Sequence, residues 1–484
     1  MKHVHLIGIG GSGLSAIALV LLERGFKVSG SDRQNSPSAQ RLQTAGARIF
    51  IGHDAANITG ADLVIRSSAI SDDNVEVRAA RDAGVPVLKR AEFLNQLTEG
   101  HQVIAVAGTH GKTTTTAMLA WIMMSYGLDP SFIVGSFSPN LGTNAHSGKG
   151  GYFVIEADEY DRMFLGLRPD IAIVTTVEHD HPDCFPTQKD FEQAFMEFVG
   201  GIKVGGKLVV CGDDPGAAHL IKAANSRGIQ CIIYGVSSNG HEITSSFNGL
   251  GYDYLARNIT RNRSGCFTFD AQDKEGTISV EVALQVPGLH NVSNALAAFT
   301  VADRLELDME RVAKALSEYR GTERRFDVKD EVAGILIIDD YAHHPTEIKS
   351  TLAATRSRFP GRPLWVVWQP HTYSRTKTFI KDYVAAFDEA DNVVVTEIYP
   401  ARESAPADGF SSKKVVEMML TRKTPNRSDI RFVPTLSMVR DLLLEELNSG
   451  DVLLVLSAGD ADQMSAELFK LLKNRIPSSS IGRS

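Results

Sequence analysis

Short apolar runs, each followed by a polar or glycine-rich turn, recur along the whole chain. Runs of this length suit strands that are buried on both faces of a parallel sheet. Segments that begin helices follow several of these turns, as at residues 14–24 and 117–122. This alternation predicts an α/β fold built from repeated strand–helix units. The apolar runs include residues 4–7, 26–32, 61–70, 85–88, 103–107, 153–155, 171–177, 335–338, 363–368, 392–397 and 451–456.

Polar breaks divide these units into three groups. Gly100 lies in the first break, and residues 321–326 are predicted to link the second group to the third. We therefore expect three α/β domains. The N-terminal domain should be Rossmann-like, the central domain should resemble a P-loop ATPase with a mainly parallel sheet, and the C-terminal domain should again be Rossmann-like. The expected boundaries are residues 1–99, 100–325 and 326–484.

Two stretches carry little functional information. Residues 203–285 are predicted to alternate short strands with turns. Residues 477–484 are polar and rich in serine, which is typical of a frayed tail.

The first group carries a glycine-rich turn at residues 8–13 (Gly-Ile-Gly-Gly-Ser-Gly), between a strand and a helix. Such a turn lets backbone N–H groups approach a pyrophosphate at the start of the helix. Asp32 ends the second strand, where an acid can reach a ribose. Ser67, Ser68 and Arg90 follow later strands and are further candidate contacts. Any nucleotide diphosphate can bind through these backbone N–H groups, so the turn alone does not identify the ligand.

A second glycine-rich turn, residues 108–116 (Gly-Thr-His-Gly-Lys-Thr-Thr-Thr-Thr), follows the apolar run at residues 103–107. Glycines there let backbone N–H groups surround phosphates, Lys112 can neutralise them, and the Thr113 hydroxyl can hold Mg²⁺. Val106 replaces the first glycine of the standard P-loop spacing, so the match is partial. Because a strand precedes the turn and a helix follows it, the turn indicates a phosphate-binding site.

Two buried strands of the second group deliver acids and imidazoles to the sheet edge where this phosphate turn is expected. They end in residues 156–161 (Glu-Ala-Asp-Glu-Tyr-Asp) and 178–183 (Glu-His-Asp-His-Pro-Asp). Mg²⁺ prefers oxygen ligands, so Glu156 with Thr113 is a candidate metal site. A histidine ligand such as His181 suits Mn²⁺ better. A solvated loop is the alternative interpretation of the histidines.

Further polar clusters follow in the chain. Residues 290–294 open a helix predicted at residues 295–305, where amides usually cap the helix and adenine-edge contacts are the alternative. In the third group, residues 339–346 (Asp-Asp-Tyr-Ala-His-His-Pro-Thr) and 369–376 (Gln-Pro-His-Thr-Tyr-Ser-Arg-Thr) each follow a strand. All three groups are therefore expected to contribute polar side chains at strand ends.

Composition narrows the class of protein. The 484 residues include 43% hydrophobic and 22% charged side chains, as in ordinary globular proteins. A formal net charge of −8 gives no indication of a nucleic-acid partner. The four cysteines lack the paired spacing of a zinc site or a disulfide framework. No run is long enough to cross a bilayer, so we expect a soluble, cytoplasmic protein without a membrane partner and leave its oligomeric state open.

Together these motifs resemble those of the Mur ligases, which are ATP-dependent amide-forming enzymes of bacterial peptidoglycan synthesis. The resemblance covers nearly the whole chain, and the order of its motifs makes it specific. It is strongest to the branch that joins L-alanine to the carboxylate of UDP-N-acetylmuramate through an acyl phosphate. The motifs are residues 8–13, 108–116, 156–161, 178–183, 290–294, 324–326, 339–346 and 369–376.

The resemblance implies ATP with Mg²⁺ or Mn²⁺, and it implies roles for single residues. Contacts to the UDP-sugar would come from Gly10, Gly11, Asp32, Ser67, Ser68 and Arg90. Contacts to ATP would come from Gly108, Thr109, His110, Gly111, Lys112, Thr113, Thr114, His290, Asn294, Arg325 and Asp340. The metal ligands would be Thr113, Glu156 and His181. The catalytic residues would be Lys112, His343, His371 and Arg375.

Three positions depart from parts of the family. Met196 stands where several sister ligases place a modified lysine, which favours the alanine-adding branch. Thr372 stands where many alanine ligases carry arginine, so a phosphate or substrate contact is in question there. Tyr160 replaces a common serine, and the sequence offers no explanation.

Three other functions compete with this interpretation. A recycling ligase that adds a whole tripeptide to UDP-N-acetylmuramate shares the motif at residues 339–346, although residues 369–376 fit the alanine enzyme better. A nicotinamide-dependent oxidoreductase explains residues 8–32 but leaves the phosphate turn unexplained. A nucleotide-binding regulatory module without chemistry leaves the acid and histidine clusters unexplained.

Overall fold

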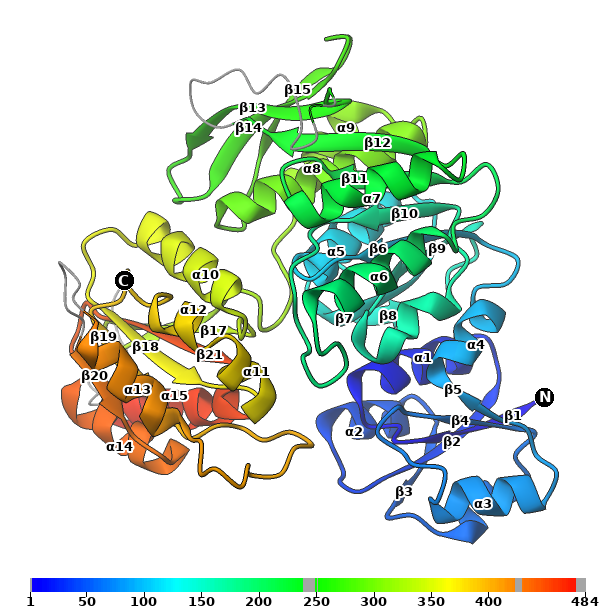
Figure 1. Cartoon of the computed structure of the whole chain (residues 1–484), viewed down its shortest axis with the longest axis horizontal. Coiled ribbons are helices and arrows are strands. Elements are labelled where there is room, and N and C mark those ends of the chain that lie inside the picture. Colours follow the sequence, from blue (N-terminus) through cyan, green and yellow to red (C-terminus); the bar gives the residue numbers. More distant parts are fainter. Residues whose placement is uncertain (1, 238–248, 250, 423–428, 476–484) are drawn as a thin grey trace.

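The computed structural model of the chain contains three sheets, each of which forms the centre of one α/β domain (Figure 1). It describes residues 2–237, 249, 251–422 and 429–475, so the tail predicted at residues 477–484 lies outside the described residues. The expected α/β class with three domains is confirmed. The three sheets lie within residues 3–89, 102–283 and 327–457, while the expected domain boundaries stay predictions.

The N-terminal sheet has five parallel strands in the order β3-β2-β1-β4-β5. Strand order reverses at β1, so the crevice beyond the carboxyl ends of β1 and β4 is the expected ligand position. Its strands are β1 (His3–Ile7), β2 (Lys27–Asp32), β3 (Arg48–Ile51), β4 (Leu63–Arg66) and β5 (Val87–Lys89). Its helices are α1 (Ser12–Glu23), α2 (Pro37–Thr44), η1 (Ala55–Ile58), α3 (Val75–Asp82) and α4 (Arg90–Leu97).

The central sheet has ten strands in the order β15-β14-β13-β12-β11-β10-β6-β9-β7-β8, and its middle is parallel. Its strands are β6 (Gln102–Ala107), β7 (Ser131–Ser138), β8 (Thr143–His146), β9 (Tyr152–Glu156), β10 (Ile171–Val174), β11 (Lys207–Cys211), β12 (Gln230–Val236), β13 (Tyr254–Arg261), β14 (Phe267–Asp273) and β15 (Ser279–Ala283). Its helices are α5 (Lys112–Ser125), η2 (Tyr160–Gly166), α6 (Gln188–Val199), α7 (Pro215–Asn225), α8 (Leu289–Arg304) and α9 (Met309–Ser317).

Two predictions for this domain were wrong. Helix α7 lies in a stretch that was expected to hold only strands and turns, and Asp214 caps it by accepting a hydrogen bond from the N–H of Ala217 (2.7 Å). Helix α8 begins at Leu289 rather than near residue 295. The amides Asn291 and Asn294 therefore lie inside the helix instead of capping it, and His290 and Asn294 lie one turn apart on one face.

The C-terminal sheet has the order β16-β17-β21-β18-β19-β20, and only β16 is antiparallel to its neighbour among these strands. Its strands are β16 (Asp327–Val332), β17 (Ile335–Asp340), β18 (Leu364–Gln369), β19 (Asn392–Val395), β20 (Asp429–Phe432) and β21 (Val452–Ser457). Its helices are α10 (Pro345–Arg358), α11 (Tyr373–Thr378), α12 (Ile380–Val384), α13 (Ser412–Thr421), α14 (Leu436–Glu446) and α15 (Ala461–Arg475).

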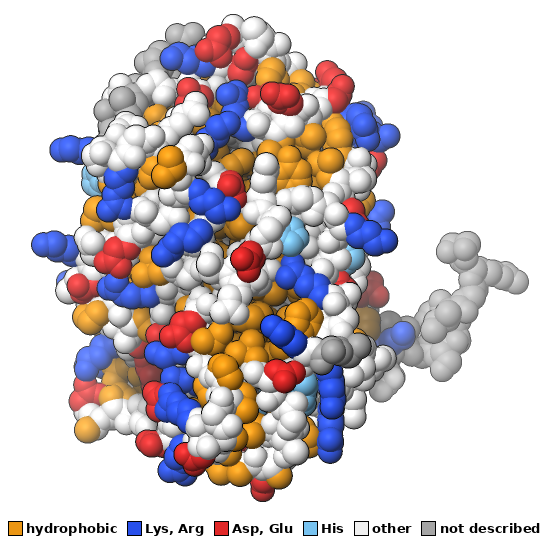
Figure 2. All heavy atoms as spheres, turned by 90° about the vertical axis from the view of Figure 1, so that its right-hand side faces the viewer, with side chains coloured by type: hydrophobic (Ala, Val, Ile, Leu, Met, Phe, Trp, Pro, Cys, Tyr) orange, Lys and Arg blue, Asp and Glu red, His pale blue; other side chains and the backbone are white. Residues whose placement is uncertain are grey.

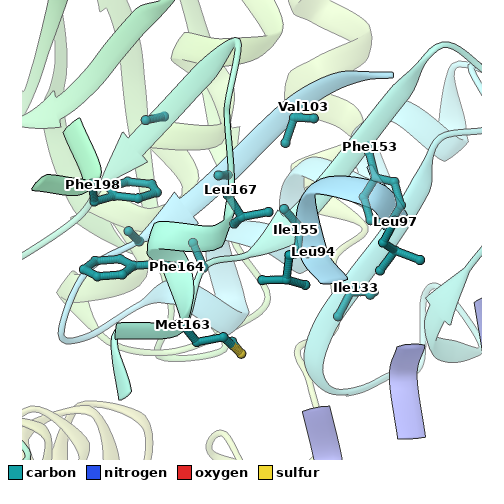
Figure 3. Close-up of a cluster of buried hydrophobic side chains, with 14 of the residues drawn as sticks. Leu94, Leu97, Val103, Ile133, Phe153, Ile155, Met163, Phe164, Leu167 and Phe198 are labelled. Carbon is teal, nitrogen blue, oxygen red and sulfur yellow. The ribbon is translucent and has the colours of Figure 1, made fainter. Parts of the chain in front are cut away.

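Helix α4 ties the N-terminal domain to the central one through a shared apolar core (Figure 3). Leu94 and Leu97 of α4 pack in the same buried cluster as Phe153 of β9 and Phe164 of η2. A Cβ atom on Gly166 would lie only 1.9 Å from the carbonyl oxygen of Ala91, so η2 approaches the α4 backbone directly. Burial of these side chains fixes the position of α4, and with it Arg90 at the start of the helix.

Every helix within the described residues is too short or too polar to span a bilayer. On the face shown in Figure 2, basic, acidic and apolar side chains are interspersed, and the basic ones do not gather in a single stripe.

Candidate active site

Two neighbouring cavities open where the domains meet. The larger, of about 610 Å³, is lined by residues of all three domains, among them Ser67, Lys112 and His371. The smaller, of about 220 Å³, lies between the central and C-terminal domains and is lined by residues such as Asn294 and Asp340. The phosphate turn after β6 contributes side chains to both cavities, so the two form one continuous candidate site.

Lys112 begins α5 and its side chain lies half-buried against the phosphate turn. Its Nζ donates hydrogen bonds to the carbonyls of Gly108 (2.5 Å) and Thr109 (3.1 Å) and forms an ion pair with Glu159 (2.8 Å). Glu159, in the loop between β9 and η2, is only 1% exposed. The lysine charge is thus held at the sheet edge by a buried carboxylate, in a turn whose N–H groups suit an anion.

Thr113 and Glu156 place two oxygen atoms side by side next to this lysine. The Thr113 hydroxyl donates to Glu156 Oε1 (3.0 Å), and the N–H of Gly135 donates to Glu156 Oε2 (2.6 Å). Burial raises the pKa of Glu156, against the opposing effect of Lys112. A half-buried carboxylate beside a hydroxyl offers the kind of oxygen donors that Mg²⁺ prefers.

His110 in the phosphate turn joins the central domain to α10 of the C-terminal domain. Its Nε2 lies 2.9 Å from Glu178 Oε2, and its Nδ1 lies 3.3 Å from Glu347 Oε1. Burial alone would lower the pKa of His110, but the two carboxylates raise it to about 9. His110 therefore carries a positive charge at neutral pH at the border of the smaller cavity.

The smaller cavity collects most of the residues predicted to contact ATP. Gly111 has a φ of 81°, and a Cβ atom there would lie 2.3 Å from Asn294 Oδ1, so the turn and α8 pack together only because this residue is glycine. Arg325 forms an ion pair with Glu347 (3.2 Å) on the opposite side. The lining includes His110, Gly111, Thr113, Thr114, His290, Asn294, Arg325 and Asp340.

Asp340 ends β17 and fixes the linker that enters the C-terminal domain. Its carboxylate accepts hydrogen bonds from the N–H groups of Phe326 (2.7 Å) and Ala342 (2.7 Å). Burial raises the pKa of Asp340 to about 6, although Arg325 opposes the shift. The same carboxylate therefore borders the smaller cavity and positions the segment that carries Arg325.

Arg375 is the centre of a buried cluster between the central and C-terminal domains. Its Nε donates to Asp180 Oδ1 (2.7 Å), Nη1 to His371 Nδ1 (2.8 Å) and Nη2 to His181 Nδ1 (3.1 Å). The side chains of Arg375 and Asp180 are 3% and 4% exposed. The guanidinium thus sets the orientation of two imidazoles that line the larger cavity.

His343 and His371 are neutral in this environment. Burial, followed by the positive charge of Arg375, lowers the pKa of His343 to about 3 and that of His371 to about 2. His343 Nδ1 donates to the Tyr341 carbonyl (2.9 Å), which leaves Nε2 as an acceptor. His371 accepts at Nδ1 from Arg375, which leaves the proton on Nε2. The two rings therefore present opposite hydrogen-bonding roles.

The glycine turn of the N-terminal domain opens into the larger cavity beside Arg90. A Cβ atom on Gly13 would lie 1.5 Å from Arg90 Nη1, so the guanidinium lies directly across the turn. Arg90 also contacts Asp158 of the central domain (3.3 Å). Gly11, Ser67, Ser68 and Arg90 line this cavity.

Three predicted site residues line neither of these two cavities: Gly10, Asp32 and Gly108. Asp32 Oδ2 accepts a hydrogen bond from the N–H of Gly10 (2.9 Å), so in this structure the acid holds the glycine turn in shape. The Lys112 ammonium is bound by the Gly108 carbonyl. The predicted ligand contacts of these residues stay predictions.

Sequence reasoning gave no role to the acids that balance the predicted cations. Glu159 pairs with Lys112, Asp180 with Arg375, and Glu347 with both His110 and Arg325. Glu159 and Asp180 stand in the predicted strand-end motifs, which were a signal for polar chemistry but not for these partners. The pairs join residues far apart in the chain, and no local pattern specifies them.

The domains and their shared cavity define a three-domain, nucleotide-dependent enzyme that gathers its reactants between domains. The chain belongs to the Mur ligase family. Models for the Mur ligase family catalytic domain, the Mur ligase middle domain and the Mur ligase glutamate ligase domain match residues 3–102, 106–302 and 324–459.

Similar proteins cover the chain from end to end. A UDP-N-acetylmuramate–L-alanine ligase of Roseiflexus sp. (strain RS-1) is 41% identical over 98% of this chain and 100% of its own length. The structure of a UDP-N-acetylmuramate–alanine ligase of Thermotoga maritima is 28% identical with a TM-score of 0.80, and covers 98% of this chain and 100% of that one. A murein peptide ligase of Psychrobacter arcticus is 27% identical with a TM-score of 0.71, and covers 99% and 100%.

Proposed function

We propose that the chain is an ATP-dependent ligase that joins L-alanine to the carboxylate of UDP-N-acetylmuramate in peptidoglycan synthesis. One observation carries this proposal. The larger cavity brings the phosphate-turn Lys112, the glycine turn with Arg90, and the Arg375 cluster to one space, each from a different domain. An enzyme that activates one substrate with ATP and then admits a second needs such a three-way junction.

The reaction follows from these groups. The muramoyl carboxylate attacks the γ-phosphate of ATP, ADP leaves, and an acyl phosphate forms. The alanine amine then attacks the acyl carbonyl, and the tetrahedral intermediate expels phosphate to leave the amide. Phosphoryl transfer needs positioning and charge neutralisation more than covalent help, and Lys112, His110 and Arg325 supply positive charge around the phosphate turn.

The amine must lose protons as the amide forms, and His343 is the better placed imidazole to receive one. Its Nε2 carries a lone pair, whereas the Nε2 of His371 carries a proton and is a donor. The low pKa of both rings in the ligand-free chain favours positioning over strong general-base catalysis. His371 would hold an oxygen of the intermediate or of the amino acid.

We also propose that Thr113, Glu156 and His181 hold a divalent cation, Mg²⁺ or Mn²⁺. Thr113 and Glu156 fit this role because their oxygens are 3.0 Å apart in a partly buried position. His181 Nε2 lies 3.3 Å from Glu159 Oε1, and His181 lines the larger cavity together with Thr113 and Glu156. A bound cation would neutralise charge on the phosphates. Metal titrations of phosphate release test the site, and identical curves for the wild type and Glu156→Gln would exclude Glu156 as a ligand.

The N-terminal domain is proposed to bind the UDP-sugar through Gly11, Ser67, Ser68 and Arg90, with Asp32 supporting the turn. Calorimetric titration distinguishes this proposal from a dinucleotide site. Binding of UDP-N-acetylmuramate without binding of NAD is expected, and the opposite result would reverse the assignment.

Phosphate release with defined acceptors tests the reaction itself. We expect release from ATP that requires UDP-N-acetylmuramate and increases with L-alanine. L-Serine should be weaker because a small pocket excludes larger side chains, and glycine should be weaker because it lacks the methyl group that the pocket binds. The similarity to a murein peptide ligase makes a tripeptide-adding enzyme the second candidate. Stimulation by L-alanyl-γ-D-glutamyl-diaminopimelate but not by L-alanine would establish that alternative.

A further inference from the structure

The segment after β19 is fixed to the wall of the larger cavity at two points. At one end, the N–H of Tyr399 donates to the Pro370 carbonyl (2.8 Å), and the N–H of Thr372 donates to the Tyr399 carbonyl (2.9 Å). At the other end, Glu403 accepts hydrogen bonds from the backbone N–H groups of Tyr373 and Ser374 at the start of α11. In Figure 1 this segment extends from the C-terminal sheet toward the N-terminal domain.

Glu403 is the second attachment point. Its Oε2 accepts from the N–H groups of Tyr373 (2.6 Å) and Ser374 (3.0 Å). A carboxylate in this place satisfies donors at the start of α11 that have no partner within the helix. Arg402 directly precedes Glu403, in the short stretch between the two attachment points, and lines the same cavity as His371 and Thr372.

Arg402 crosses from the C-terminal domain onto an aromatic ring of the central domain. Its guanidinium carbon lies 4.2 Å from the centroid of the Tyr160 ring. Tyr160 is itself oriented, because its hydroxyl donates to Asp183 (2.9 Å) and its ring packs edge-on against His181 (5.1 Å between centroids). A guanidinium stacked on an aromatic face keeps its N–H edge available for a planar anion.

The charge balance of the cavity singles out Arg402. The other lysine and arginine side chains of its lining each have a carboxylate partner; they are Arg90, Lys112, Arg324, Arg325 and Arg375. Within the described part of the chain, Arg402 has no carboxylate within ion-pair distance. Thr372, which lines the same cavity, is neutral, and its hydroxyl accepts a hydrogen bond from the Arg375 N–H (3.4 Å). Arg402 therefore supplies the uncompensated positive charge on this wall.

We propose that Arg402, stacked on Tyr160, binds the α-carboxylate of the incoming amino acid. The inference rests on the proposed ligase function. Of the two carboxylates in that reaction, the muramoyl group must meet the γ-phosphate near Lys112, whereas the amino-acid carboxylate stays charged and unreacted. A permanent cation in the cavity that His343 and His371 also line would hold that carboxylate while the amine points to the acyl phosphate. Glu403 is a positioning residue for Arg402.

Steady-state phosphate release tests the assignment with Arg402→Gln. We expect the KM for L-alanine to rise at least tenfold, while the KM values for ATP and UDP-N-acetylmuramate change less than twofold. L-Alaninamide, which lacks the carboxylate, should be a poor acceptor for the wild type and equally poor for Arg402→Gln. Arg440→Gln removes a partly exposed arginine of α14 that lines neither cavity, and it should leave all three KM values unchanged.

Further variants test the roles of Tyr160 and Glu403 separately. Tyr160→Phe keeps the ring and should retain most of the affinity for L-alanine, whereas Tyr160→Leu removes the stacking face and should raise the KM. Glu403→Gln should raise the KM in the wild type but add little in the Arg402→Gln background, as expected for a residue that acts through Arg402.

Failure of the Arg402 assignment and failure of the proposed function give different results. An unchanged KM for L-alanine in Arg402→Gln would overturn the proposal, and so would a rise confined to the KM for UDP-N-acetylmuramate. If the wild type shows no phosphate release that depends on L-alanine, the proposed function fails before Arg402 is tested. Equal losses for L-alanine and L-alaninamide would also overturn the carboxylate contact.

Discussion

Lys112 and Glu159 form a pair whose two members have different importance for folding and for catalysis. Both side chains are largely buried, at 13% and 1% exposed, and their charged atoms lie 2.8 Å apart. Removing one member of a buried pair leaves the other charge uncompensated, which costs far more than replacing both. The phosphate turn thus depends on the pair for stability, although only the cation is predicted to contact phosphate.

Replacing Lys112 should therefore separate the two effects. We expect Lys112→Ala to abolish phosphate release and to lower the free energy of unfolding by about 3 kcal/mol, because Glu159 is left buried without a partner. The double variant Lys112→Ala/Glu159→Gln should recover most of the stability and none of the activity. Urea unfolding and phosphate release measure the two quantities. A double variant as unstable as the single one would exclude Glu159 as the cause.

Glu76 is a second buried carboxylate, far from the chemistry, in the N-terminal domain. It is completely buried and accepts hydrogen bonds from the Ser31 hydroxyl (2.5 Å) and the Asn57 amide (2.6 Å). His5 and His53 lie 3.5 Å from the same carboxylate. Burial alone would raise the pKa of Glu76, but these partners lower it to about 2.

Acid should destabilise the N-terminal domain through Glu76. The ordinary pKa of the group is 4.5, so between about pH 4.5 and pH 2 the unfolded chain binds a proton that the folded chain does not. Stability from this group is present above pH 4.5 and is lost as the pH falls toward 2. Urea midpoints measured from pH 7 to pH 3 should fall less steeply for Glu76→Gln than for the wild type. Parallel curves would contradict a depressed pKa.

The helices and strands show what a sequence of this kind can and cannot predict. The strands before both glycine turns and the acids after β9 and β10 were predictable, because buried parallel strands are continuous apolar runs. Helix α7 was missed although Asp214 and Pro215 form a standard helix start. The start of α8 was placed late because the amides Asn291 and Asn294 were interpreted as caps, whereas Gly288, with a φ of 96°, is the residue before the helix.

Side-chain partners across domains could not be predicted at all. Arg375 and Asp180 are 195 positions apart, and their contact depends on how two separately folded domains meet. The same holds for His110 with Glu347 and for Arg402 with Tyr160. The resemblance to a family supplied the names of several site residues, but the acids and the ring that orient them became visible only in the packed structure.

The contact between the phosphate turn and α8 gives a test at the level of these elements. Gly111→Ala places a Cβ atom 2.3 Å from Asn294 Oδ1 and also strains a φ of 81°. Gly127→Ala, just after α5, strains a φ of 75° with no neighbour within 4 Å, and is the matched control. Both variants should lose about 1 kcal/mol of stability from the backbone alone. Only Gly111→Ala should lose more than this and bind ATP more weakly, as measured by calorimetry.

The N-terminal and C-terminal domains are joined to the central domain by different kinds of interaction. The N-terminal domain shares a continuous apolar core with it through α4, whereas the two core clusters of the C-terminal domain contain only that domain's own residues. The C-terminal domain meets the central one through polar contacts, including Arg375 with Asp180 and Thr346 with Glu178. Polar interfaces between domains open more readily than apolar ones, so the C-terminal domain is the one expected to move when substrates enter and products leave.

The Asp180–Arg375 pair should set the balance between the open and closed arrangements. Asp180→Asn removes the negative charge beside a guanidinium that is 3% exposed, and separation of the domains lets water solvate that guanidinium again. We expect a larger radius of gyration by small-angle X-ray scattering without ligands, and phosphate release reduced at least tenfold. Asp408→Asn is the matched control, because Asp408 pairs with Lys377 on the exposed surface of a single domain, where ion pairs contribute little. If Asp180→Asn keeps the wild-type radius of gyration and loses only activity, the pair acts on the orientation of His371 and His181 and not on domain closure.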